Sequence, residues 1–460
     1  MADGGRSFYG VLMTAALPSV PAQANRHFLQ AVVDLSETQE IALSEDVYNE
    51  KGIKLLAAGA KVSAEMYAKV ISHKLVKPIE VCISAGDPPS GALLARIAEE
   101  VLEQLPLLAG ICNWSQGRVT PVGMLSKCKM SSSAGTLLAV SFSRSENAAH
   151  HAVMTSLIAM GIANAYRYND PQLMAAMCLG GLFHDVGELY VDPAVLHGEK
   201  LTAAEWMSYA SHPIIGAALA REVCGFDAMT QRAILEHHEY ADGFGYPRSL
   251  RGQAISMPGR ILSLAEVLSA LVQKPAAFSR IDIALKIMPG EHEPELVSLV
   301  NDLLREGRSA TRDKVEALED DVNANVHSVF LRIAEVLMVY DELMSKSART
   351  TPGVQAILDE AFNRFAEVQK AFASTGVAGL SMLDGKLDCD ELAESRFEAH
   401  CVFNEIAWRL QKLSRELVLK AAKARDDDAR DLLRMANALA GAVVDEESVE
   451  DLGRVAVESS

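Results

Sequence analysis

The sequence predicts a mainly α protein: an all-α helical domain in the middle of the chain, preceded by a small N-terminal α+β domain and followed by a C-terminal helical region. Three observations support this prediction. Hydrophobic residues make up 49% of the 460 residues and aromatic residues only 6%. Apolar residues recur at helical spacing over most of the chain, and short β-like runs are confined to its first part.

Residues 1–85 are predicted to form the small α+β domain. The strings "VYNEKGIKLLAAGAKVS" and "KPIEVCIS" contain short β-like runs, and Asn49 to Gly52 is typical of a hairpin turn. The string "AGDPPSG" follows, and its Asp-Pro-Pro predicts a boundary or the start of a helix.

Residues 92–275 are predicted to form the all-α domain. Apolar residues at helical spacing are separated by Asn-Asp-Pro, Gly or Asp-Pro breaks. The expected helical segments are 156–168, 171–185, 202–223, 227–239 and 257–272.

Residues 290–445 are predicted to form a C-terminal helical bundle, and residues 446–460 a flexible acidic tail. Long amphipathic segments cover 326–344 and 403–424, with a Gly-rich stretch at 374–386 between them. We expect these helices to serve as a homodimer surface rather than as a second active site.

Charge and cysteine content exclude several classes of protein. The formal net charge of −18 argues against binding to a nucleic acid polymer, which requires a basic surface. Seven scattered cysteines without a CxxC pair predict neither a disulfide framework nor a thiolate zinc site. The sequence contains no run of eighteen apolar residues, so no membrane-spanning helix is predicted. A reducing, cytoplasmic location is therefore expected.

Histidines concentrate in one part of the chain. Seven of the twelve lie between residues 150 and 238, interleaved with acidic residues. One histidine in a helix is usually structural, and His292, His327 and His400 are interpreted in that way. Several histidines with carboxylates on separate predicted helices indicate a metal site, because imidazole and carboxylate together bind Fe, Mn, Zn or Ni.

Four strings carry a resemblance to a known family. In this order and spacing, "GLFHDVGELYVDPAVL", "SHPIIGAALA", "HHEYADGFGYP" and "GRILSLAEVLSAL" resemble the HD-GYP family of cyclic di-GMP phosphodiesterases, a branch of the HD hydrolases. The resemblance covers about residues 145–275. It implies that the domain at 92–275 is an HD-type helical domain that binds metal.

The resemblance also implies a ligand set and a cofactor. Two divalent metal ions are expected, with iron favoured and Mn or Ni as alternatives. His184 and Asp185 would be the catalytic pair, with Asp185 bridging the ions. The implied metal ligands are His151, His184, Asp185, His212, His237, His238 and Glu266.

The first ligand leaves an alternative open. His151 is favoured over His150 because Ile162 and Ala163 then fall in register with the family pattern. Family members with three metals often carry a glutamate four residues before this histidine. Asn147 stands there in this chain, whereas Glu146 is four before His150. A two-metal site is therefore favoured, and a third ion remains the alternative.

The Gly-Tyr-Pro loop is implied to lie near the substrate and to serve as a docking surface for a diguanylate cyclase or another signalling protein. Glycines there permit a tight turn, the tyrosine offers a ring and the proline stiffens the exit. The expected substrate-binding residues are Glu188, Asp242, Gly243, Gly245, Tyr246, Pro247 and Lys274.

Three features depart from the family. Glu188 stands where the family usually has a lysine thought to contact the substrate phosphate, so an anion replaces a cation. Glu266 stands where the family has aspartate, which keeps the carboxylate but moves its oxygens. The basic, aromatic segment that usually follows is missing, and Lys274 and Arg280 are left as phosphate contacts.

The expected function is hydrolysis of cyclic di-GMP to pGpG and/or GMP in bacterial second-messenger signalling. The departures at Glu188 and Glu266 motivate an alternative: a catalytically weak or inactive sensor or adaptor that binds metal, nucleotide or a protein partner. A third alternative is an HD-type hydrolase that acts on another phosphoester.

Overall fold

The computed structural model describes residues 19–441 with internal gaps at 113–119, 168–169, 197–200, 275–276, 288–289, 309–321, 346–350, 375–388, 422–423 and 425. The predicted acidic tail and most of the Gly-rich stretch lie outside the described residues. The chain divides into two compact units. Unit 1 comprises residues 1–199, 208–270 and 295–311, and unit 2 comprises residues 200–207, 271–294 and 312–460.

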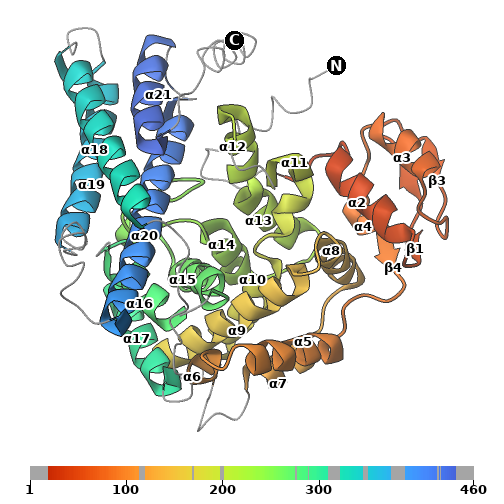
Figure 1. Ribbon diagram of the computed structural model, residues 1–460. Coiled ribbons are helices and arrows are strands. Elements are labelled where there is room, and N and C mark those ends of the chain that lie inside the picture. The colour runs from red at the N-terminus through yellow and green to blue at the C-terminus, as the bar shows by residue number, and fades with distance from the viewer. Residues whose placement is uncertain are drawn as a thin grey trace. The chain divides into compact units, whose positions relative to one another are not determined.

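The prediction of a mainly α protein is confirmed (Figure 1). In the described residues the strands form two small two-stranded antiparallel sheets, both near the N-terminus. One pairs β1 (Ile41–Leu43) with β4 (Ile83–Ala85), and the other pairs β2 (Val47–Tyr48) with β3 (Lys54–Leu56). The expected hairpin turn at Asn49 to Gly52 joins β2 to β3, and Gly52 has a φ of 74° there.

One N-terminal prediction is wrong in part. The string "KPIEVCIS" was expected to be a β-like run, but it begins with the short helix α4 (Ile79–Cys82) before β4. Pro78 precedes α4, and its fixed φ suits the start of a helix better than the interior of a sheet. The other N-terminal helices are α2 (Arg26–Ser36) and α3 (Ala64–Ile71).

Helices dominate the rest of unit 1. They begin where capping residues favour a start: Ser90 accepts from the backbone of Leu93, and Asp170 accepts from Leu173. The elements are α5 (Gly91–Gln104), α6 (Leu108–Cys112), α7 (Pro121–Ser126), α8 (Ser132–Phe142), α9 (Ala148–Tyr166), α10 (Pro171–Phe183), η1 (Val186–Tyr190), α11 (Pro193–Leu196), α13 (His212–Glu222), α14 (Ala228–Glu236), η2 (Gly252–Ala254) and α17 (Pro294–Arg308), whose first residue belongs to unit 2.

The centre of unit 1 is formed by α9 and α10, which lie side by side (Figure 1). Every residue from Ala152 to Ala163 of α9 is buried, and α10 is nearly as enclosed. A helix that is apolar on all sides needs neighbours on all sides, and α5, α6 and α14 supply them.

The predicted helical segment at 202–223 is divided in two. The structure has α12 (Ala203–Ala210) and α13, with Ser211 between them. Pro213 explains the interruption, because it lacks the N–H that a continuous helix would need and is tolerated only in a first turn. This restart places His212 at the N-terminal end of α13.

The regular secondary structure described in unit 2 is helical. Its longest helix, α20, packs against α18, α19 and α21, and α16 also contacts it. The helices are α16 (Ala277–Ile287), α18 (Val322–Ser345), α19 (Pro352–Ser374), α20 (Cys389–Ala421) and α21 (Asp426–Ala440). The helix α15 (Met257–Val272) begins in unit 1 and ends in unit 2. The domain boundaries drawn from the sequence stay predictions, as does a homodimer through these helices. No described helix is both long and apolar enough to cross a membrane.

Candidate metal centre

The first pair of imidazoles comes from α9 and α10. His151 lies in the first turn of α9, and His184 caps the C-terminal end of α10. Their Nε2 atoms are 3.1 Å apart. Gly181 makes this approach feasible, because a Cβ at that position would lie 2.3 Å from the Cα of Ser156 on α9.

The second pair comes from α13 and α14, which pack against each other. His212 begins α13, His237 caps the end of α14, and their Nε2 atoms are 3.2 Å apart. Gly187 lets η1 lie against the start of α13, because a Cβ there would be 2.0 Å from the carbonyl oxygen of His212.

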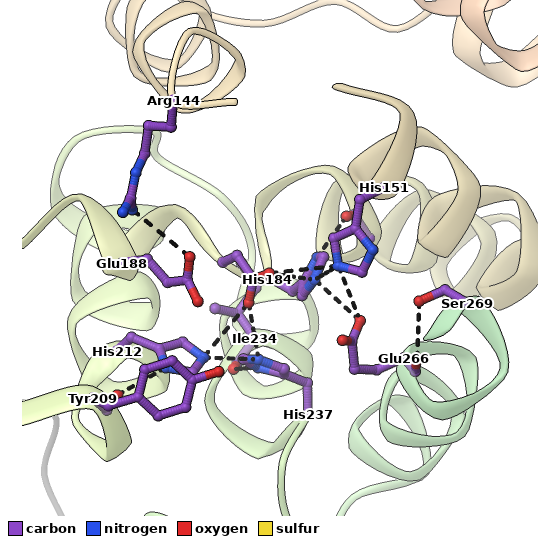
Figure 2. A network of polar contacts seen from close by, with 12 residues as sticks. Arg144, His151, His184, Glu188, Tyr209, His212, Ile234, His237, Glu266 and Ser269 are labelled. Carbon is purple, nitrogen blue, oxygen red and sulfur yellow. Dashed lines mark hydrogen bonds and ion pairs between the residues drawn. The ribbon is translucent and has the colours of Figure 1, made fainter. Parts of the chain in front are cut away.

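Asp185 links the two pairs of imidazoles. Its Oδ2 lies 3.0 Å from Nε2 of His184 and 3.5 Å from Nε2 of His151. Its Oδ1 lies 3.6 Å from Nε2 of both His212 and His237. Each carboxylate oxygen therefore faces a different pair of imidazoles. Figure 2 shows the two pairs, His151 with His184 and His212 with His237.

Glu266 and His238 lie at opposite ends of this cluster. Oε2 of Glu266, on α15, is 3.2 Å from Nε2 of His184 and 3.4 Å from Nε2 of His151. This oxygen is buried and has no hydrogen-bond partner among the described residues. His238 joins the other side, where Asp185, His212, His237 and His238 can bring one ligand atom each within 4.8 Å of one another.

The hydrogen bonds of the rings indicate what the cluster can hold. Nδ1 of His184, His212 and His237 lies 2.8, 2.9 and 2.6 Å from the backbone oxygens of Gly181, Tyr209 and Ile234, respectively. A carbonyl oxygen only accepts, so each Nδ1 carries the proton that it donates. In a neutral ring, Nε2 then carries a lone pair that points into the cluster.

Lone pairs that face one another and a carboxylate repel unless a cation lies between them. The two groups, His151–His184–Asp185 and Asp185–His212–His237–His238, are therefore able to hold a metal. Metal-binding histidines usually donate their other ring N–H in this way, to a carbonyl or carboxylate oxygen.

The pKa values differ between the two groups of metal-binding candidates, the one with His151 and the one with His212. Although burial opposes it, attraction to Glu266 and a hydrogen bond with Asp185 raise the pKa of His151 to about 10. Burial together with repulsion from His237 lowers the pKa of His212 to about 3, so this ring is neutral. Burial would raise the pKa of Asp185, but His184 and the other imidazoles hold it well below its ordinary value.

The Gly-Tyr-Pro loop follows the second pair directly. The ring of Tyr246 stacks on His238, with centroids 4.6 Å apart. Gly243 has a φ of 85°, which favours glycine, whereas Gly245 is required by close approach: a Cβ there would be 2.4 Å from the carbonyl oxygen of His238. The Tyr246–Pro247 peptide bond is cis.

Buried glutamates and Asp242 hold this loop through its backbone. Glu239 accepts from the N–H groups of Arg248 (2.7 Å) and Leu250 (2.8 Å), and Glu236 accepts from Ser256. Asp242 accepts from the N–H of Phe244 at 2.9 Å, so it shapes the turn in addition to any contact with a ligand.

Two further residues predicted to bind substrate, Glu188 and Lys274, lie in different units of the chain. Oε2 of Glu188, on η1, is 3.7 Å from Nη1 of Arg144, so this carboxylate is paired rather than simply exposed. Lys274 belongs to unit 2, and its predicted contact with the substrate is left as a prediction.

Sequence reasoning missed Tyr209 and Arg144. The Tyr209 ring lies 5.1 Å from that of His212 and 6.4 Å from that of Tyr246, and its backbone oxygen fixes the His212 tautomer. Figure 2 shows Tyr209 beside His212, and Arg144 on the far side of Glu188 from the histidines. The only sequence signal for Arg144 is that it precedes His151 by seven residues, and Tyr209 precedes His212 by three.

The chain resembles known proteins over this region. The model of the HD domain family matches residues 139–293. A 3'3'-cGAMP-specific phosphodiesterase 1 of Vibrio cholerae is 37% identical over 103 residues, which is 22% of this chain and 24% of that protein.

Two other relatives carry a cyclic di-GMP phosphodiesterase name. One from Vibrio cholerae is 42% identical over 104 residues, covering 20% of this chain and 21% of its own length. PA4108 from Pseudomonas aeruginosa is 32% identical over 122 residues, covering 26% and 29%. Each alignment thus spans less than a third of the relative's length.

The match to the HD domain model falls on the segment that builds the histidine cluster, which also carries the "HHEYADGFGYP" string. Residues 139–293 of this chain are therefore an HD domain, and the domain is of the HD-GYP type.

Proposed function

We propose that this HD domain is a metal-dependent phosphodiesterase that hydrolyses cyclic di-GMP to pGpG and/or GMP. The observation that supports the proposal best is the placement of Asp185, whose two oxygens face two separate pairs of imidazole nitrogens. This is the arrangement expected of a carboxylate that bridges two ions at a phosphodiester-cleaving centre.

The residues of the cluster would hold two divalent ions, and iron is the proposed metal, with Mn or Ni as alternatives. His151, His184 and Glu266 would serve one ion, and His212, His237 and His238 the other, with Asp185 shared. When bound, such ions supply Lewis-acid stabilisation of a phosphodiester and activation of the attacking water near neutral pH.

The protein groups contribute orientation and enclosure. The backbone oxygens of Gly181, Tyr209 and Ile234 hold three rings in one orientation, so Nε2 of each ring already faces the cluster before a ligand binds. His184, His212 and His237 are almost completely buried, which strengthens electrostatic interactions within the centre. The half-buried Tyr246, stacked on His238, presents its ring beside the same cluster.

Glu188 is the observation that favours a second candidate function. Burial raises the pKa of Glu188 to about 8, and charge repulsion from the nearby Asp185 acts in the same direction. Where Glu188 is ionised, its negative charge beside the site disfavours a doubly anionic substrate. The alternative is therefore a sensor or adaptor that binds metal and nucleotide without turnover.

The deciding experiment measures hydrolysis by full-length protein loaded anaerobically with Fe(II) or Mn(II). Cyclic di-GMP and 3'3'-cGAMP are compared, because relatives carry both names. Metal content is quantified in each sample, and the double variant His184→Ala/Asp185→Ala is the control.

Conversion of cyclic di-GMP that the double variant lacks would support the phosphodiesterase. Preference for 3'3'-cGAMP would instead overturn the proposed substrate but keep the reaction class. Bound metal and nucleotide without turnover would favour the sensor, and a wild-type protein that retains no metal would contradict both.

A further inference from the structure

Arg144 lies at the edge of the metal centre although no motif contains it. It follows α8, beyond the C-cap residue Ser143. Its Nη1 is 3.7 Å from Oε2 of Glu188, and the two side chains are 19% and 22% exposed. Figure 2 shows Glu188 between this guanidinium and the imidazoles.

The position of Arg144 is set by packed elements. The helix α8 contacts both η1, which carries Glu188, and α9, which carries His151. The backbone N–H of Arg144 donates to Ser141 at 3.3 Å, so the residue continues the end of α8. The guanidinium is therefore held beside the cluster by the same packing that forms the cluster.

The positive charge of Arg144 lies in a region that is otherwise rich in negative charge. Asp185, Glu188 and Glu266 place three carboxylates in or beside the centre, and the ligand expected there carries two phosphodiester charges. The pKa of Arg144 is lowered mainly by burial, while attraction to Glu188 and Asp185 acts in the opposite direction, so the charge is felt at both carboxylates. Arginine stays protonated under any working condition.

The donors of Arg144 are largely uncommitted. A separation of 3.7 Å is too long for a hydrogen bond, and the side chain makes no hydrogen bond to another described residue. A guanidinium has five N–H donors in a planar fork that matches phosphate oxygens. Glu188 restrains it on one side and leaves the other donors for a ligand.

We propose that Arg144 binds a phosphate of the cyclic dinucleotide at the edge of the cluster, and that Glu188 is a positioning residue that holds the guanidinium there. This inference rests on the proposed function, because it assumes a cyclic dinucleotide as ligand. It assigns a second role to Glu188: the carboxyl group opposes the substrate where it is ionised, but it also holds a cation beside the site.

The test compares the full-length, metal-loaded wild type with Arg144→Gln, Arg144→Lys, Glu188→Gln and the double variant Arg144→Gln/Glu188→Lys. Steady-state kcat and KM are measured for cyclic di-GMP and for bis(p-nitrophenyl) phosphate, which has one phosphodiester instead of two. Equilibrium dialysis, with chromatography showing that the nucleotide is intact, gives an affinity that does not depend on turnover.

Loss of a charge-assisted contact predicts that Arg144→Gln weakens cyclic di-GMP binding about tenfold, seen mainly in KM, with a smaller effect for the single phosphodiester. Arg144→Lys should retain part of the affinity. The double variant places the cation at position 188 instead of 144, and it should restore much of the affinity for cyclic di-GMP. Metal content should stay at the wild-type level in all variants.

A matched control is Arg221→Gln, which removes the same charge nine residues beyond His212 on α13, roughly 13 Å along the helix. It should leave KM within about twofold, since a charge beyond a Debye length is largely screened.

Three outcomes would overturn the inference. Arg144→Gln could bind cyclic di-GMP as tightly as the wild type. It could lose bound metal, which would make Arg144 a structural residue of the centre. The double variant could bind no better than Arg144→Gln, which would refute a role for charge. A wild type that binds no cyclic dinucleotide refutes the proposed function itself, and Arg144 then has no such ligand.

Discussion

Two buried polar clusters, one in each unit, satisfy their carboxylates by opposite means. In unit 2, Glu291 is 4% exposed and receives Nζ of Lys412 at 2.5 Å and Nη2 of Arg409 at 2.9 Å. In unit 1, the ion-pair partners of Asp185 among the described residues are imidazole nitrogens, at 3.0–3.6 Å. Glu291 has permanent cations from its own chain, whereas Asp185 has imidazole rings, which carry a positive charge only when they are protonated.

The difference distinguishes a structural ion network from a ligand cage. Burial would raise the pKa of Glu291, but Lys412 and Arg409 hold it well below its ordinary value. Oε2 of Glu405, 2.6 Å from Nη1 of Arg409, supplies a second carboxylate, so the charges of that cluster balance without any added group. Around Asp185 the balance needs protons or a metal, so the same chemistry of burial leads to a binding site in one unit and to a packing element in the other.

A third buried carboxylate completes the comparison. Glu80, on α4, is 2% exposed and accepts a hydrogen bond from the Tyr190 hydroxyl. Its Oε2 has no hydrogen-bond partner among the described residues, and burial raises its pKa to about 7. A carboxylate with neither a cation nor a ligand cage is thus protonated over part of the physiological range.

The largest expected effect comes from removing the shared carboxylate of the cage. Asp185→Asn keeps the shape but loses the charge, so we expect metal content to fall and cyclic di-GMP turnover to drop by at least roughly 1000-fold, equivalent to about 4 kcal/mol. Metal analysis and product chromatography measure both. Asp34→Asn, at an exposed position of unit 1, is the matched control. Full metal content in Asp185→Asn would contradict the cage.

The ion network should respond in stability instead of in metal binding. Glu291→Gln leaves Lys412 and Arg409 buried without their carboxylate, and we expect the free energy of unfolding to fall by about 3–5 kcal/mol. Urea unfolding followed by tryptophan fluorescence measures this, in a Trp114→Phe background so that Trp206 and Trp408 of unit 2 report.

The control for that network is Asp282→Asn. It breaks the exposed pair with Lys286 in the same unit, which should cost less than about 1 kcal/mol. An equal loss of unfolding free energy in Glu291→Gln and Asp282→Asn would mean that the buried Glu291 cluster stabilises the fold no more than an exposed ion pair does.

The unpaired carboxylate predicts a pH dependence of stability. Glu80 has a pKa of about 7 in the folded state against an ordinary value of 4.5. The unfolded chain releases this proton first, so stability from this group is complete below pH 4.5 and is lost as pH rises through 7. The loss is about 3 kcal/mol at most.

Glu80→Gln isolates that term because glutamine stays neutral. Unfolding free energies of the wild type and the variant are measured by circular dichroism in urea at pH 5 and pH 8. Between these pH values, the variant should become more stable relative to the wild type. A difference that is the same at both pH values would show that Glu80 does not titrate in this range.

The smallest effect concerns stabilisation by the metal itself. A ligand present at 100 times its Kd stabilises the folded state by about 2.7 kcal/mol, so Mn(II) should raise the melting temperature of the wild type by several degrees and a chelator should reverse this. His212→Ala should show a much smaller shift, while Glu291→Gln should keep the wild-type shift. An equal metal response in His212→Ala would place the ion elsewhere.

The sequence by itself determined the fold class and the chemistry of the cluster. Helical periodicity is local, and Pro, Gly and capping residues mark the ends of segments, so a mainly α protein could be predicted. The string from His237 to Pro247 is long enough to identify the HD-GYP pattern. It also identified the residue types that the structure brings together, although their role as ligands stays a prediction.

Tertiary structure decided how those residues are arranged. The division of the Asp185 oxygens between two imidazole pairs and the pairing of Glu188 with Arg144 both depend on contacts between segments tens of residues apart. Local patterns carry no information on such distances, because side chains meet through packing of whole helices. The close approaches at Gly181 and Gly187 are the physical reason that these residues meet.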